Sequence, residues 1–299
     1  MSLISICVAT YQRPEGLRAL LESIEQQSLP NDVAVEIIVV DNDPPSAKPV
    51  VCAHAHTSQY DVRYLSQSEQ NISLTRNVAV EASTGDFVWF VDDDEVADPA
   101  CLGRLLSAIE EHDAAGVFGP VLASFDGDAV PDWSKQFYQR PVHTTGSIST
   151  AHRTSNTLVR SEVLARVPGP FDPEYGVTGG TDSMLFRQLE SEGFQFINSA
   201  AAFVTEAVPA NRASWEWLTT RARRQGQNYG RQTVTLHGKP LTPGVMFMSL
   251  KAVIQITTSG ALAIATWTDR SRRASHLLHM WTNVGKLEGV AGSSTTRDT

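Results

Sequence analysis

Apolar residues in the first third of the chain come in short runs between polar turns, and most runs have the length of a strand. Such runs, rich in Val, Ile and aromatic residues, are typical of strands covered on both faces. They predict strands at residues 3–9, 35–40, 62–65 and 87–91. Apolar residues at helical spacing predict helices at residues 15–27 and 71–82. This alternation predicts a mostly parallel sheet with right-handed crossovers, the nucleus of an α/β fold.

The middle of the chain continues the same alternation less regularly. A helix is expected from residue 98 to about 112, a strand at 116–122 and a returning strand at 155–160. Between the strands lies a long loop, residues 126–142, which carries Trp133 and Phe137. A loop of this length in a compact domain is usually functional or mobile. Its aromatic side chains either stack on a ligand or anchor the loop on the core, and the sequence leaves both open.

Polar side chains cluster where three of the predicted strands end. Thr10 and Tyr11 follow the first strand, and Asp41 follows the second. Acids 92–95 follow the strand at 87–91. Any one cluster can be turn chemistry, because Asp, Asn and Pro favour turns. Three clusters at the carboxyl edge of one sheet predict a ligand-binding crevice.

The run Gly85 to Glu95, GDFVWFVDDDE, carries a buried strand directly into four consecutive acidic side chains. Four neighbouring carboxylates repel one another unless a cation holds them. Their hard oxygen atoms suit Mg²⁺ or Mn²⁺ rather than zinc, and Mg²⁺ completes its shell with substrate phosphates. We therefore expect a metal–diphosphate site here. The alternative is a solvated acidic turn.

Composition narrows the class of protein without changing this picture. The 299 residues are 41% hydrophobic and 19% charged, as in an ordinary globular protein of one large or two small domains. The formal net charge of −9 argues against nucleic acid as a partner. Three widely spaced cysteines indicate neither a disulfide framework nor a zinc site. No secretory signal is visible, so we expect a reduced, cytoplasmic compartment.

Three segments, ISICVATYQRP, IIVVDND and NISLTRNVAVEASTGDFVWFVDDDE, together resemble a known family. Their order and spacing are similar to the nucleotide-binding half of the family 2 glycosyltransferases, which have the GT-A fold. The resemblance covers roughly residues 3–235. It implies a GT-A α/β catalytic domain at residues 1–238, with a nucleotide-binding half at about 1–98 and an acceptor half at about 99–238. A helical extension is expected at residues 239–299.

The resemblance implies roles for the matching residues. The nucleobase would be held by the first two strand ends, at Thr10, Tyr11, Arg13 and Asp41. An Arg-Asn pair of the family, near the nucleotide and its phosphates, matches Arg76 and Asn77.

The family's metal-binding DxD motif matches Asp92, Asp93 and Asp94. Asp92 would lie near the ribose, and Asp94 would hold the Mg²⁺ or Mn²⁺ ion that bridges the diphosphate. The family often has Gly where the helix at 71–82 begins, whereas this chain has Asn71. We expect Asn to be accepted there because it tolerates unusual backbone angles.

A second block, residues 171–196, places Gly179 and Gly180 shortly before Asp182. The glycines permit close approach of the backbone to a donor ligand. Asp182 begins a helix, where simple capping would account for it. The block resembles the family's GGED segment, whose acidic residue deprotonates the acceptor hydroxyl, and so implies Asp182 as general base. The family's preceding Glu is here Thr181, which leaves that Glu's part in acceptor positioning in doubt.

The segment after this block adds charged residues with two interpretations each. Where relatives often carry a His near the metal, the nearest match is Glu206, a surface acid or a residue beside the site. A cluster of arginines follows, and it is either a solvated face or a partner for a diphosphate or an anionic membrane: Arg221, Arg223, Arg224 and Arg231.

The composition changes again after Lys239. Residues 245–267 are largely apolar but interrupted by polar residues, so they are marginal as a membrane span. Three basic residues follow, Arg270, Arg272 and Arg273, and residues 276–290 are amphipathic. This pattern favours helices on a membrane surface, and packing against the main domain is the alternative. Residues 293–299 are expected to be disordered.

The resemblance therefore implies an inverting transferase. A sugar would pass from a nucleotide diphosphosugar, a UDP-sugar foremost, to a hydroxyl acceptor that is lipid-linked or a polysaccharide. The enzyme would work in the cytoplasm at the inner face of the membrane. One alternative is a nucleotidyltransferase of related fold, which needs a Gly-rich basic loop that TYQRPEG lacks. Another is a non-catalytic sugar-nucleotide binding protein.

Overall fold

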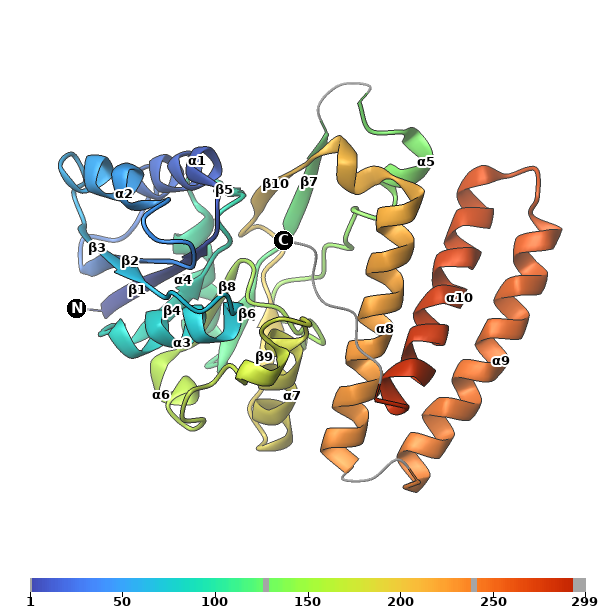
Figure 1. Ribbon diagram of the computed structural model, residues 1–299. Coiled ribbons are helices and arrows are strands. Elements are labelled where there is room, and N and C mark those ends of the chain that lie inside the picture. The colour runs from blue at the N-terminus through green and yellow to red at the C-terminus, as the bar shows by residue number, and fades with distance from the viewer. Residues whose placement is uncertain (1, 126–128, 238–240, 293–299) are drawn as a thin grey trace. The chain divides into compact units, whose positions relative to one another are not determined.

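The computed structural model describes residues 2–125, 129–237 and 241–292, so the expected disorder of residues 293–299 lies outside the described part. The chain divides into two compact units (Figure 1). The first comprises residues 1–124, 140–176 and 181–207, and the second comprises residues 125–139, 177–180 and 208–299. This division differs from the expected boundary at residue 238, because helix α8 (Trp215–His237) packs with the helices of the tail.

A seven-stranded sheet forms the centre of the first unit. The strand order is β3-β2-β1-β4-β8-β6-β9. β8 runs antiparallel to both neighbours, and the other neighbouring pairs are parallel, which confirms the predicted mostly parallel sheet. The strands are β1 (Ser2–Thr10), β2 (Val33–Asp41), β3 (Asp61–Ser66), β4 (Phe87–Phe90), β6 (Gly116–Phe118), β8 (Thr157–Arg160) and β9 (Phe196–Asn198).

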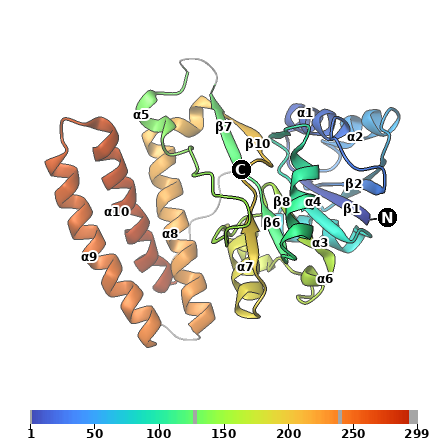
Figure 2. The ribbon, with the colours of Figure 1, turned by 180° about the vertical axis from the view of Figure 1, so that it is seen from behind.

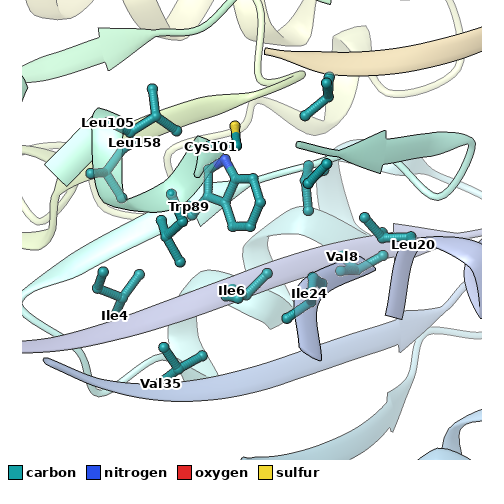
Figure 3. Packing of buried hydrophobic residues seen from close by; sticks show 14 of the residues in the cluster. Ile4, Ile6, Val8, Leu20, Ile24, Val35, Trp89, Cys101, Leu105 and Leu158 are labelled. Atoms are coloured by element: carbon teal, nitrogen blue, oxygen red, sulfur yellow. The ribbon is translucent and has the colours of Figure 1, made fainter. Parts of the chain in front are cut away.

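Helices cover both faces of this sheet, which is why its strands are apolar at successive positions. Their bounds are α1 (Pro14–Glu25), α2 (Lys48–Ala55), α3 (Ile72–Ala82), α4 (Cys101–Glu111), α6 (Ser161–Leu164) and α7 (Thr181–Ser191). One core cluster joins alternate residues of β1 to α1, α2 and α4, and the other joins the intervening residues to α3, α6 and α7. Figure 3 shows the fully buried Trp89 of β4 among aliphatic side chains of the first cluster.

The apolar run at 116–122 is not the single strand that its composition predicts. It divides into β6 and β7 (Val121–Phe125), and β7 joins a separate three-stranded sheet with β10 (Val204–Val208) and β5 (Glu95–Ala97). The break falls at Gly119 and Pro120. Pro has no amide hydrogen for a ladder, and a Cβ on Gly119 would lie 2.1 Å from the carbonyl oxygen of Ala202. The backbone crowding therefore ends the first strand.

Asn71 begins α3 for a reason other than the expected one. Its φ is −155°, which is extended backbone, so the explanation by unusual backbone angles is wrong. Its Oδ1 accepts hydrogen bonds from the amides of Ser73 (3.0 Å) and Leu74 (3.3 Å). Asn is thus favoured as an N-cap, because it satisfies amides that have no partner inside the helix.

Three long helices dominate the second unit, α8, α9 (Pro243–Ala265) and α10 (Arg270–Val290). In both Figure 1 and Figure 2, α10 lies between α8 and α9. Two glycine pairs spaced by four residues line the α8–α10 contact: Gly226 and Gly230 on α8, and Gly285 and Gly289 on α10. A Cβ at any of them would lie 1.9–2.3 Å from a carbonyl oxygen of the facing helix. Only glycine permits backbones this close.

The loop with Trp133 belongs to this helical unit and contains the short helix α5 (Asp132–Lys135). The Trp133 ring lies 6.3 Å from that of Phe137 and 6.2 Å from that of Trp215. The Arg270 guanidinium covers Trp133 at 5.1 Å. Of the two interpretations, the structure supports the anchor: Trp133 fastens the loop to α8 and α10. The chain also contains two short 3₁₀ helices, η1 (Pro173–Tyr175) and η2 (Ala210–Ala213).

Candidate active site

The ends of β1 and β4 lie side by side, because these strands pair in parallel. Thr10 therefore meets the acidic run, and its Oγ1 donates to Oδ2 of Asp93 (2.8 Å). The backbone amide of Tyr11 approaches the same oxygen at 3.4 Å. Burial raises the pKa of Asp93 to about 6, although the charge of Arg13 opposes the shift. Asp93 is thus a buried residue at the ends of these strands.

Arg13 supplies positive charge to the acidic run. Its Nη1 donates to Oδ1 of Asp93 (2.9 Å) and to Oδ2 of Asp94 (2.7 Å). The first turn of α1 lies directly against these acids, since a Cβ on Gly16 would stand 2.6 Å from the carbonyl oxygen of Asp93. A guanidinium thereby relieves part of the repulsion between consecutive carboxylates.

Arg76 of α3 joins two distant parts of the sequence. Its Nη1 donates to Oδ1 of Asp182 (2.5 Å), and its Nη2 lies 3.3 Å from Oδ1 of Asp92. The other Asp182 oxygen accepts from the Thr154 hydroxyl at 3.1 Å. The expected base therefore stands beside the strand-end acids. Thr154 is 1% exposed, and nothing in its sequence context distinguishes it from a core threonine.

The surroundings of Asp182 differ from those of a helix cap. One carboxylate oxygen accepts from Arg76 of α3, and the other accepts from Thr154 in the segment before β8. Among the described residues, neither accepts from an amide of α7. The neighbouring Thr181, where the family has Glu, is buried, and its Oγ1 accepts from the Ser73 hydroxyl at 2.8 Å. Thr181 thus ties the start of α7 to α3.

Two other expected nucleotide contacts are held by the protein itself. Asp41 is fully buried, and its carboxylate accepts from the Tyr64 hydroxyl (3.0 Å) and from the turn at residues 43–47. Burial, followed by this bond, raises the pKa of Tyr64 to about 12. Asn77 exchanges hydrogen bonds with the backbone of Phe171, at 2.8 and 2.9 Å. Asp41 and Asn77 therefore fix the backbone around the strand ends.

Gly179 and Gly180 belong to the helical unit, whereas the other expected site residues belong to the first unit. Both have positive φ, +84° and +94°, where a side chain would be strained. The carbonyl of Gly180 accepts from Nε2 of Gln232 (2.7 Å), and Arg231 donates to the Thr178 hydroxyl (2.6 Å). The glycine segment is thus held by α8.

The arginines of α8 have internal partners. Arg221 covers the rings of Tyr138 and Trp217, and Arg231 holds the glycine segment as described. Arg223 donates to both carboxylate oxygens of Glu288. These contacts stabilise the helical unit. In the first unit, Glu206 pairs in register with Glu95 and lies 3.7 Å from the Arg140 guanidinium.

Among the described residues, no group of three His, Cys, Asp or Glu side chains gathers as a metal cluster. Mg²⁺ commonly uses only one or two carboxylates and completes its shell with phosphates and water, so it requires no such cluster. Carboxylates 92–94 at the strand end have the donor chemistry of Mg²⁺ or Mn²⁺. These residues therefore fit a divalent ion that binds together with a diphosphate.

Comparison with known proteins gives matches over most of the chain. The profile of "Glycosyl transferase family 2" matches residues 5–167. The succinoglycan biosynthesis protein ExoM of Rhizobium meliloti (strain 1021) is 34% identical over 97% of this chain and 93% of that protein. Poly(ribitol-phosphate) β-N-acetylglucosaminyltransferase TarS of Staphylococcus aureus (strain Mu50 / ATCC 700699) is 30% identical over 38% of this chain and 20% of its own length.

Solved structures share the fold at lower identity. The mannosyltransferase PcManGT of Pyrobaculum calidifontis, solved with GDP-Man and Mn²⁺, has a TM-score of 0.64 at 17% identity and covers 95% of this chain and 86% of its own. S. aureus TarS 1-349, solved with UDP, has a TM-score of 0.54 at 17% identity and covers 98% and 92%. The expected GT-A fold is confirmed. The sequence segments, the strand-end site and these matches together show that the chain belongs to glycosyltransferase family 2.

Proposed function

We propose that this glycosyltransferase is metal-dependent and inverting, and that it moves a sugar from a nucleotide diphosphosugar to a hydroxyl group. A UDP-sugar is the donor we favour, and the acceptor is a lipid-linked glycan or polysaccharide. Arg76 carries the assignment, because its guanidinium bonds both Asp182 and Asp92 and so joins a candidate base to the strand-end acids.

The donor would bind at the carboxyl ends of the strands. The nucleobase would lie by Thr10, Tyr11, Arg13 and Asp41, the ribose would lie by Asp92, and Asp93 would also belong to the donor site. Arg76 and Asn77 would stand near the nucleotide phosphates. Arg13 donates two hydrogen bonds to the acids. These bonds support the placement, because a bound ligand can replace contacts between the protein's own charged groups.

Asp94 would hold the divalent ion, Mg²⁺ or Mn²⁺. When bound, such an ion neutralises charge on the leaving diphosphate, as a Lewis acid. The hard oxygen donors of the strand end support this assignment.

Asp182 would accept the proton of the attacking hydroxyl, as a general base. The Arg76 guanidinium donates a hydrogen bond to one oxygen of this carboxylate and holds it in place. Thr154 fixes the second oxygen and thereby the direction of the carboxylate. Attack from the face opposite the leaving group would invert the anomeric carbon in one step, with no covalent enzyme intermediate.

Release of nucleoside diphosphate tests this proposal. The chain is incubated with UDP-, dTDP- and GDP-sugars, with and without Mn²⁺, and free diphosphate is measured. We expect release from one class of donor, dependent on the metal and abolished by chelation. Release that continues unchanged with a chelator present would refute the metal dependence, and release from none of the donors would refute the donor class.

We also propose that the helical unit contacts a membrane surface. By length and composition, α9 is the one described helix able to cross a membrane, but it is little buried. Only a narrow stripe of it packs inside the unit, at Val245, Ala252, Ser259 and Ala263. Its exposed side chains are mostly apolar, and the large ones are Met246, Phe247, Leu250, Val253, Ile254, Leu262 and Ile264.

The packing of α9 favours lying on a membrane over spanning it. Ser259 of α9 bonds His279 of α10 at 3.0 Å, and α10 carries Arg272, Arg273 and Glu288. A spanning α9 would draw these charges into the lipid, at high cost. An in-plane helix leaves them outside.

The charge distribution supports an anionic surface as partner. Residues 208–299 contain twelve Lys and Arg against four Asp and Glu, whereas residues 1–207 contain twelve against twenty-nine. Each basic residue near an anionic membrane contributes about 1 kcal/mol. We expect the full chain to pellet with anionic vesicles and to be partly released by salt, and Phe247→Gln with Leu250→Gln to stay in solution. Equal sedimentation of the parent with and without vesicles would contradict membrane contact.

A further inference from the structure

Two arginines of the first unit form a positively charged spot that the proposed chemistry does not use. Arg153 precedes Thr154, the residue that holds Asp182, and Arg140 lies at the start of the same segment of the unit. Arg153 bonds the carbonyl of Gly119 at the beginning of the β6–β7 connection. Arg140 faces Glu206 on β10, which pairs with β7 in the small sheet. Arg153 therefore lies beside the connection that leads into β7, and Arg140 lies beside β10, the strand paired with β7.

The charge of Arg153 is stabilised at short range by a carbonyl and an aromatic ring, and the carboxylates of Glu95 and Asp92 act on it only from a distance. Its Nη2 donates to the Gly119 carbonyl (2.7 Å), and its guanidinium lies 5.5 Å from the centre of the Phe118 ring. Its Nε is buried and, among the described residues, has no hydrogen-bond partner. Within the described part of the chain, Arg153 forms no ion pair closer than 4 Å. Arg is the residue best suited to pair with a phosphate or carboxylate. In Arg153 the Nε donor is not used for such a pair.

Arg140 adds a second positive charge and is itself only loosely paired. Its Nη2 lies 3.7 Å from Glu206, longer than a hydrogen bond. Burial, followed by the charge of Arg140, lowers the pKa of Arg153 to about 10, although the charges of Glu95 and Asp92 oppose the shift. Arg153 therefore remains charged at neutral pH, although its neighbour makes the charge costly. A bound anion would relieve both the repulsion and the unsatisfied donor.

We propose that Arg140 and Arg153 form a subsite for an oxyanion, a phosphate or a carboxylate, carried by the acceptor. The assignment to the acceptor rests on the proposed function. Arg153 is the chain neighbour of the residue that orients the base, whereas the donor is assigned to the strand ends with Arg13 and Arg76. An acidic sugar and a phosphate-linked carrier share this chemistry.

Calorimetric titration with two small probes tests the subsite. Methyl phosphate and methyl glucuronide are titrated into the full chain saturated with UDP and Mg²⁺, so that the nucleotide site is filled. We expect millimolar binding of at least one probe, and the preferred probe identifies phosphate or carboxylate as the group. Arg140→Gln and Arg153→Gln should each weaken binding roughly tenfold or more, the loss of a charge-assisted bond.

Arg104→Gln is the matched control, because Arg104 also donates to a backbone carbonyl, that of Ala201, and lies in the same unit. It should bind the probes as the parent does. Should Arg153→Gln fail to fold, the half-exposed Arg140 still provides the test. No binding by the parent, or unchanged binding by a folded Arg140→Gln, would overturn the subsite. Failure to bind UDP would instead count against the proposed donor, and the same titration without UDP would still decide the subsite.

Discussion

Replacing Asp182 by Asn separates a catalytic base from a structural carboxylate. Asn keeps the size of the side chain and one oxygen that can accept from Arg76. In the parent, Nη1 of Arg76 lies 2.5 Å from Oδ1 of Asp182. The hydroxyl of Thr154 can rotate to accept from the new amide. Asn cannot, however, take a proton from the acceptor. Geometry is therefore kept while the base is removed.

The two roles differ in expected magnitude. Loss of a general base lowers turnover by roughly 10²–10⁴, which is about 3–5 kcal/mol in activation free energy. Stability should fall less, by about 1–2 kcal/mol, because one charged hydrogen bond becomes neutral and Arg76 keeps its contact with Asp92. Donor affinity should stay near the parent value, since the base acts on the acceptor.

Diphosphate release in the presence of acceptor measures turnover, urea denaturation measures stability, and calorimetry with UDP measures donor affinity. Asp172→Asn is the matched control. Asp172 also begins a helix, η1, and its carboxylate accepts from the amide of Glu174, which is a pure capping contact. Parent-like turnover in Asp182→Asn, with a stability loss similar to that of the control, would refute the base.

Asp94→Ala should abolish metal-dependent donor binding with little loss of stability, and chelator-sensitive turnover at the parent rate would count against Asp94. Gly285→Ala should destabilise the helical unit by about 1–3 kcal/mol in urea, because its Cβ would lie 2.0 Å from the Arg223 carbonyl oxygen. Gly260→Ala, whose nearest neighbour is 3.9 Å away, should be neutral or stabilising. Burial raises the pKa of Glu36, but hydrogen bonds from Ser5 and Thr84 and the charge of Arg63 together lower it below 4.5. The stability that Glu36 contributes is therefore present above pH 4.5 and lost as pH falls below it, and the urea midpoint of Glu36→Gln should depend less on pH in that range.

The sheet of the first unit follows from local composition. Strands buried on both faces need apolar side chains at successive positions, so β1, β2 and β4 are visible as short Val- and Ile-rich runs. The acids after β4 are also visible, because the change from apolar to charged residues marks the point where the chain leaves the sheet. Periodicity likewise predicted α1 and α3 close to their observed bounds.

Contacts between distant residues decided the rest. Arg76 bonds Asp182 and Asp92 only because α3, α7 and β4 meet in space, and Thr154 becomes a partner of Asp182 for the same reason. No local pattern distinguishes a threonine that orients a carboxylate from one that fills a core.

The divisions of the chain also depend on tertiary packing. The run at residues 116–122 has uniform strand composition, yet backbone crowding at Gly119 sends its two halves into different sheets. α8 was expected within the catalytic domain, but its glycines allow the backbone of α10 to approach so closely that the two helices form one unit. Sequence alone determined which segments are strands, helices and charged turns, because those depend on neighbours along the chain. Which of them pack together was decided by shape and hydrogen bonding between residues far apart in sequence, and only the tertiary structure contains that information.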